Sequence, residues 1–150
     1  MERKISGRLL KWKGKKNRKP LLMTGVRQCG KTYIIKEFGK NEFESVAYFN
    51  FDGNTGLQSI FDYDLDAERI LGELSDTVYG DRIIQGKTLV VFDEIQDCPR
   101  AIQSLKYFCE NMPELHLIAA GSLLGVALRQ RRHFLSGGKS RSYRDVSDEF

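Results

Sequence analysis

Short apolar runs alternate along this chain with segments that are apolar on one side only. Runs of apolar and β-branched residues predict four strands, at residues 20–24, 45–51, 87–94 and 115–120. Helical spacing of apolar residues predicts four helices, at residues 3–13, 31–38, 66–80 and 99–113. Residues 55–65 follow neither period. The alternation predicts an α/β fold of three layers, in which helices cover both faces of a mainly parallel sheet.

Local signals set the expected helix ends and faces. Gly39 is expected to end the second helix, and Asp66 is expected to cap the N-terminus of the third. An apolar stripe on the first helix should pack against the domain; its residues are Ile5, Leu9, Leu10 and Trp12. His116 has no nucleophile and acid at a recognisable spacing, so we expect a structural residue at a sheet edge or against a helix.

The composition suits one globular domain. The 150 residues are 41% hydrophobic, which is enough for a core. The three cysteines, Cys29, Cys98 and Cys109, have neither metal-ligand nor disulfide spacing. No secretory signal begins the chain, and its least polar stretch, residues 115–128, is too short to span a bilayer. These features predict a cytoplasmic protein without a membrane span.

Charge is distributed unevenly. Residues 1–20 hold nine Lys and Arg against one acid, and residues 21–128 hold nine against 16. Residues 129–150 are basic again, with six against three. A basic N-terminal arm could hold nucleic acid. We favour the interpretation that residues 1–19 are an N-terminal segment that packs on the domain through its apolar stripe, because no aromatic residues are interleaved with the charges.

An eight-residue pattern after the first strand predicts phosphate binding. It reads Gly25, Val26, Arg27, Gln28, Cys29, Gly30, Lys31 and Thr32. Glycines let backbone N–H groups approach phosphate oxygens, Lys31 can reach the β- and γ-phosphates, and the Thr32 hydroxyl can bind Mg²⁺. The strand before the pattern and the helix after it argue against a coincidental glycine turn. The pattern therefore predicts an ATP site with Mg²⁺.

The third predicted strand ends in two carboxylates. Four apolar residues, Leu89 to Phe92, suit a strand buried on both faces, and Asp93 and Glu94 follow at its carboxyl end. Ligands of open α/β sheets bind at that edge. Asp93 is expected to hold Mg²⁺ with its water shell, and Glu94 to polarise the attacking water. We expect their side chains to point differently, because successive strand residues alternate faces.

Four segments together closely resemble the AAA-type ATPase domain of a large prokaryotic group, the archaeal-type, STAND-like ATP-binding proteins. They are residues 18–22, 25–32, 90–96 and 120–125. The resemblance covers residues 3 to about 129. It implies a P-loop NTPase sheet of the additional-strand, catalytic-glutamate type, with strand order 2-3-4-1 by appearance along the chain. It also places Ser122 at the polar sensor position near the γ-phosphate.

The resemblance stops near residue 129. Members of the group typically continue into a fifth strand, a lid and a larger C-terminal domain, whereas residues 130–150 hold few apolar residues in no regular register. The expected organisation is an ATPase core over residues 1–129 and a poorly ordered basic tail over 130–150, with the fifth strand missing. A truncated chain of this kind is expected to self-associate or to depend on a missing C-terminal half.

The sequence thus predicts Mg²⁺-dependent ATP binding, with hydrolysis as the ancestral activity. The catalytic residues are expected to be Lys31, Glu94 and Ser122, and the metal-binding residues Thr32 and Asp93. Two alternatives stay open at this point: a nucleotide-binding switch or fragment that does not hydrolyse ATP, and a nucleic-acid-binding module built on the N-terminal arm.

Overall fold

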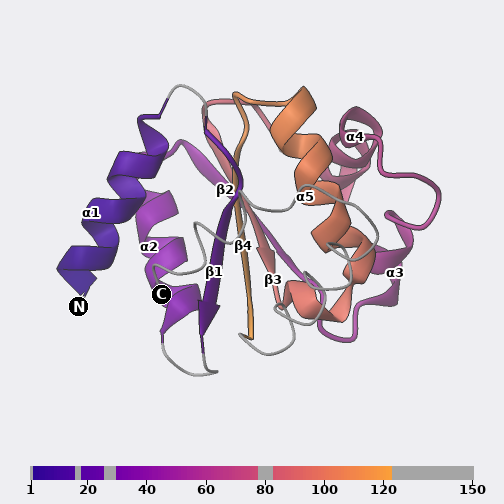
Figure 1. The fold of residues 1–150 in the computed structure, drawn as a ribbon, viewed down its shortest axis with the longest axis horizontal. Helices are drawn as coiled ribbons and strands as arrows, with labels where there is room; N and C mark the ends of the chain where they lie inside the picture. Colours follow the sequence, from indigo (N-terminus) through magenta and orange to yellow (C-terminus); the bar gives the residue numbers. More distant parts are fainter. Residues whose placement is uncertain (1, 16–17, 26–29, 78–82, 123–150) are drawn as a thin grey trace.

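A computed structural model of the chain describes residues 2–15, 18–25, 30–77 and 83–122 (Figure 1). The elements in these ranges are α1 (Glu2–Lys13), β1 (Leu21–Gly25), α2 (Lys31–Glu42), β2 (Ser45–Asn50), α3 (Thr55–Ser59), α4 (Ala67–Thr77), β3 (Thr88–Asp93), the 3-10 turn η1 (Ile95–Asp97), α5 (Pro99–Asn111) and β4 (His116–Ser122). The predicted loop residues Val26 to Cys29 and the predicted tail, residues 130–150, lie outside the described residues.

The four described strands form one parallel sheet in the order β1-β4-β3-β2. This confirms the α/β class and the strand order that the resemblance implies. β3 lies inside the sheet, and all six of its residues are buried. Its continuous apolar run therefore fits a strand that is covered on both faces. Among the described strands, β1 and β2 form the two ends of the sheet.

Helices cover both faces of the sheet, as expected for three layers. Figure 1 shows α1 and α2 on one side and α3, α4 and α5 on the other. The core under α1 and α2 contains Leu9, Trp12, Ile35 and Phe38. The opposite core is larger and centres on Phe92, whose ring lies 5.5–6.2 Å from four other phenylalanine rings. Edge-to-face ring pairs of this kind add to the burial of apolar area.

The predicted end of α2 at Gly39 is wrong. The helix continues to Glu42, and Gly39 is a buried residue of its interior. A Cβ atom at Gly39 would lie 2.4 Å from Cγ2 of Val46 in β2. The glycine therefore lets the helix approach the sheet closely, which is a second common use of this residue.

Two loops also differ from the sequence predictions. Residues 55–65 are not wholly irregular, because Asn54 caps the short helix α3 through a 3.0 Å bond from the Leu57 N–H to its side chain. Asp66 caps α4 as predicted, with its Oδ2 accepting from the Arg69 N–H at 3.1 Å. Glu94 is not a strand residue: β3 ends at Asp93, and Glu94 adopts left-handed backbone angles, φ 54° and ψ 43°.

The N-terminal helix packs on the domain, as the favoured interpretation of the basic arm expected. Leu9 and Trp12 are buried, and the Trp12 indole N–H donates to the Lys19 carbonyl at 2.7 Å. Leu10 departs from the expectation, because its side chain is 48% exposed. His116 lies in an inner strand and not at a sheet edge, with its buried ring between Trp12 and Phe43.

Candidate functional site

The predicted site residues gather at the carboxyl edge of the sheet. β1 ends at Gly25, and Ser122 is its register partner at the end of the neighbouring strand β4. Asp93 ends β3 on the other side of β4. Because all strands run parallel, the three strand ends meet at one edge, where open α/β sheets bind ligands.

Helix α2 begins at the same edge of the sheet as the end of β1. Gly30 has φ +82°, a backbone conformation that suits glycine, and it precedes the first residue of α2, Lys31. No described atom lies within 4 Å of a Cβ placed at Gly30. The first turn of an α-helix leaves backbone N–H groups without intrahelical partners and carries the positive end of the helix dipole, so the N-terminus of α2 is suited to attract phosphate.

A hydrogen bond joins the two motifs that the sequence analysis singled out. The Thr32 hydroxyl in the first turn of α2 donates to Oδ2 of Asp93 at 2.8 Å. β4 separates β1 from β3 in the sheet, so the bond links the helix that follows β1 to a strand that is not a neighbour of β1. The structure therefore brings the two residues that we predicted to bind metal into direct contact.

The Asp93 carboxylate is buried and well satisfied. Asp93 is only 4% exposed to solvent. Oδ2 accepts from the hydroxyls of Thr32 and Tyr48, and Oδ1 accepts from the Glu94 N–H at 2.8 Å. Three donors offset the cost of burying the charge, because an ionised carboxylate forms strong hydrogen bonds.

Sequence reasoning missed Tyr48, which it assigned only to a strand. Tyr48 is the register partner of Val91, two residues before Asp93, so it lies on the same sheet face as that carboxylate. Burial first, and then the hydrogen bond to Asp93, raise the pKa of the Tyr48 phenol. The phenol is consequently a neutral hydrogen-bond donor. The Lys36 ammonium lies 4.1 Å from the centre of its ring.

The backbone turn at Glu94 redirects the chain away from the sheet. Glu94 is the one residue other than glycine with positive φ among the described residues. The turn aims its N–H back at Asp93, and its half-buried side chain accepts from Nε2 of Gln96 at 2.8 Å. Left-handed backbone at a residue with a side chain is costly and concentrates at functional sites. The Asp93 and Glu94 carboxylates have different hydrogen-bond partners, and Glu94 follows the strand in a left-handed turn, so strand alternation does not relate the two side chains.

The other predicted residues are placed by their backbone alone. Lys31 starts α2 and Ser122 ends β4, both at the carboxyl edge of the sheet. Their side chains, and residues Val26 to Cys29, lie outside the described part of the structure.

The oxygen atoms of Thr32 and Asp93 fit a hard divalent cation. A hydroxyl and one carboxylate are the kind of ligands that Mg²⁺ takes from a protein when phosphates and water complete its shell. In the described ranges, no group of three or more His, Cys, Asp and Glu could hold a metal ion by itself. The donor set thus suits a cation that arrives with a phosphate ligand, and not an all-protein metal site.

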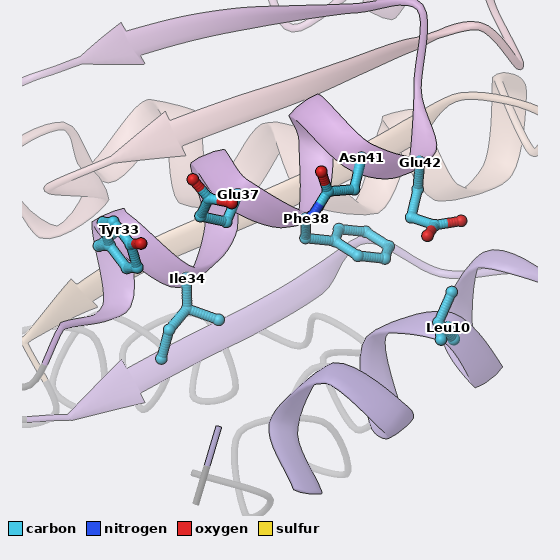
Figure 2. A pocket seen from close by; sticks show the side chains of 7 residues that line it. All are labelled: Leu10, Tyr33, Ile34, Glu37, Phe38, Asn41 and Glu42. Atoms are coloured by element: carbon cyan, nitrogen blue, oxygen red, sulfur yellow. The ribbon is translucent and has the colours of Figure 1, made fainter. Parts of the chain in front are cut away.

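A shallow groove of about 270 Å³ lies elsewhere, between α1 and α2 (Figure 2). Its lining residues are Leu10, Tyr33, Ile34, Glu37, Phe38, Asn41 and Glu42. Ile35, which lies in the core, and Lys36, which lies over the Tyr48 ring, do not line this groove. The half-exposed Leu10 is explained here, because it lines the groove.

The strand order, together with the phosphate-binding sequence pattern between β1 and α2, defines the class of this protein: an α/β P-loop NTPase fold with one strand between β1 and the acidic strand β3. Residues 17–143 match the family described as AAA domain, and the chain belongs to that family. Membership indicates an ATP-binding or ATPase module. No similar protein was found among curated proteins. None of the helices in the described ranges has the length and apolar character needed to cross a membrane.

Proposed function

We propose that this chain binds ATP with Mg²⁺ at the carboxyl edge of its sheet and hydrolyses the γ-phosphate. The observation that carries the proposal is the 2.8 Å hydrogen bond between Thr32 and Asp93. It joins a hydroxyl at the end of a phosphate-binding pattern to a buried carboxylate from the strand beyond β4. Two sequence signals that are 61 residues apart thereby meet in one place.

Each residue has a distinct proposed task. Backbone N–H groups of residues 25–32 hold the phosphates, and the Lys31 ammonium binds the β- and γ-phosphate oxygens. Thr32 and Asp93 hold Mg²⁺, which supplies neutralisation of phosphate charge when bound. A hydroxyl can donate its hydrogen to Asp93 and still offer a lone pair to a cation, so the bond in this structure is compatible with that task.

Hydrolysis requires a base and a γ-phosphate contact. Glu94 is proposed to orient the attacking water and to accept its proton, and Ser122 to contact the γ-phosphate from the end of β4. Gln96 supports this arrangement, because its amide donates to the Glu94 carboxylate and fixes its direction. We propose residues 1–129 as the ATPase core, of the archaeal-type, STAND-like group.

The N-terminal arm does not favour nucleic acid as the ligand. Two of its cations contact carbonyl groups of the chain itself: Lys13 donates to Glu42 at 2.8 Å, and Arg18 donates to Glu114 at 3.0 Å. These contacts support the packing role for residues 1–19. They give no reason to prefer the basic arm over the sheet edge as the ligand site.

A titration of the purified chain with a fluorescent ATP analogue, with and without Mg²⁺, tests the proposal. We expect Mg²⁺-dependent binding that Lys31→Ala weakens at least tenfold, the effect of losing a charged hydrogen bond of about 1.5 kcal/mol or more. Lys40→Ala, an exposed cation in the last turn of the same helix, is the matched control and should bind like the wild type. Equal binding by both variants would overturn the assignment of the site.

A turnover assay on the same sample distinguishes an ATP-hydrolysing enzyme from a nucleotide-binding switch that does not hydrolyse ATP. Release of phosphate that requires Mg²⁺ supports hydrolysis. Tight, Mg²⁺-dependent binding without phosphate release would instead leave a nucleotide-binding switch as the function of this chain.

A further inference from the structure

Tyr48 occupies a position that the proposed nucleotide chemistry has not yet used. Its hydroxyl donates to Oδ2 of Asp93, the same oxygen that accepts from Thr32. The tyrosine comes from β2, at one end of the described sheet, and the carboxylate comes from the inner strand β3. The contact therefore connects Asp93 to β2, a strand that supplies none of the site residues predicted from the sequence motifs.

We propose that Tyr48 is a positioning residue, which fixes the Asp93 carboxylate through its hydroxyl so that the carboxylate can hold Mg²⁺ beside the nucleotide. The inference rests on the proposed function. It assigns no contact between Tyr48 and substrate or metal, because the hydroxyl is used on Asp93.

The count of lone pairs shows why this contact matters. An ionised carboxylate offers about four lone-pair positions. Thr32 and Tyr48 use those of Oδ2, and the Glu94 N–H uses one on Oδ1. One position on Oδ1 is left to face a hydrated cation. The carboxylate plane is set by donors on both oxygens, and of the two donors on Oδ2 the Tyr48 hydroxyl is the one that is not itself a predicted metal ligand.

The surroundings of Tyr48 hold its ring in place. The ring packs at the margin of the core under α2, and the Lys36 ammonium lies over its face at 4.1 Å. A cation over an aromatic face is attracted by the ring quadrupole. Lys36 is one helical turn after Thr32, so the first two turns of α2 supply one donor to Asp93 and the cation over the ring of the other donor.

Tyr48→Phe removes the hydroxyl and keeps the ring, so it separates positioning from packing. The measurement is the Mg²⁺ concentration that gives half-maximal binding of a fluorescent ATP analogue. We expect this midpoint to rise about tenfold in Tyr48→Phe, the lower end of the effect of removing an outer partner of a metal ligand. Binding without Mg²⁺ and the circular dichroism spectrum should stay unchanged. Tyr107→Phe on α5 is the control and should match the wild type.

A double-mutant cycle tests whether the effect passes through Asp93. In the Asp93→Asn background, the further change Tyr48→Phe should have no effect on the Mg²⁺ midpoint, because the group that it positions is gone. Additive effects would show that Tyr48 acts elsewhere and would overturn the proposal. An unchanged midpoint in Tyr48→Phe alone would also overturn it.

The outcomes distinguish this inference from the function on which it rests. Wild-type protein without Mg²⁺-dependent nucleotide binding would overturn the proposed function and this inference with it. Wild-type binding that is unaffected by Tyr48→Phe would overturn the inference alone. If Tyr48→Phe does not fold, Lys36→Gln provides the second test: it frees the ring and keeps the hydroxyl, and a midpoint that does not rise would overturn the proposal.

Discussion

Gly39 and Val46 are packed so closely that no side chain fits at position 39, where α2 crosses β2. A Cβ atom at Gly39 would lie 2.4 Å from Cγ2 of Val46 and 3.0 Å from Cδ2 of Leu89. Gly39→Ala should therefore lower the free energy of unfolding by about 1–3 kcal/mol, the usual cost of overpacking. The gain in helix propensity, about 1 kcal/mol, is too small to reverse this result. Urea denaturation measures the change.

Gly72 provides the matched control for this prediction. It lies inside α4, is exposed, and has no described atom within 4 Å of a Cβ position. Gly72→Ala should raise the free energy of unfolding by about 0.5–1 kcal/mol through propensity alone. A Gly39→Ala variant as stable as Gly72→Ala would contradict the close approach of α2 to the sheet.

His116 should make the domain sensitive to acid. Its Nε2 donates to the Lys13 carbonyl at 3.4 Å, and its Nδ1 has no partner among the described residues. Burial, and then the charge of Arg18, lower the pKa of His116 from 6.5 to about 4. The unfolded chain thus takes up the proton first. Stability should be full above pH 6.5, fall between pH 6.5 and about 4, and level off below, with a total on the order of 3 kcal/mol.

Two variants isolate the contribution of this imidazole. His116→Phe keeps a ring between Trp12 and Phe43 and should flatten the pH dependence of the urea midpoint between pH 6.5 and 4. His133→Gln changes the other histidine of the sequence and should leave the wild-type profile unchanged. An identical slope in His116→Phe would show that carboxylates, and not this histidine, cause the loss of stability.

Glu94 combines a costly backbone conformation with a proposed catalytic role, and substitutions separate the two. Glycine adopts left-handed angles freely, so Glu94→Gly should be more stable than Glu94→Ala by about 1 kcal/mol. Glu94→Gln keeps the side-chain length and should bind ATP like the wild type. Its turnover should fall about a hundredfold or more, because an amide cannot accept the proton of water. Wild-type turnover in Glu94→Gln would exclude the role as base.

Asp93 should control the dependence of binding on Mg²⁺. Asp93→Asn removes the negative charge and leaves one acceptor oxygen for three donors. We expect the Mg²⁺ concentration that gives half-maximal nucleotide binding to rise by more than it does in Tyr48→Phe, and the free energy of unfolding to fall by about 1–3 kcal/mol. Asp76→Asn, on the exposed side of α4, should change neither quantity. Unaltered Mg²⁺ dependence in Asp93→Asn would refute the metal assignment.

Features that follow from the periodic pattern of apolar residues could be predicted from the sequence. Features that depend on a contact with a residue from another segment could not. The four strands and the helices α1, α2, α4 and α5 follow from local period, whereas α3 does not, and the resemblance supplied the order of the strands. Glycine commonly follows a helix, so the sequence predicts a helix end at Gly39, whereas the actual role of Gly39 depends on its close approach to Val46 in β2. The left-handed angles of Glu94 were not predictable, since the residue type disfavours them.

The contact between Tyr48 and Asp93 was missed for the same reason. A tyrosine in a strand is ordinarily a packing residue, and no spacing along one strand reports a partner on another. Only the register between β2 and β3 shows that the two side chains share a face. The proposed metal pair, by contrast, could be named in advance because each member belongs to a motif with a chemical reason for its spacing.

The position of Trp12 makes its fluorescence a probe of the fold that should not respond to nucleotide binding. Trp12 is the one tryptophan of the sequence, and it packs edge-on against His116 at a ring distance of 5.5 Å. His116 begins β4, whereas Ser122 ends that strand at the proposed nucleotide site. The indole therefore sits at the amino edge of the sheet, the far end from the ligand. Its emission should report unfolding of the domain and protonation of the imidazole, and stay silent when nucleotide binds.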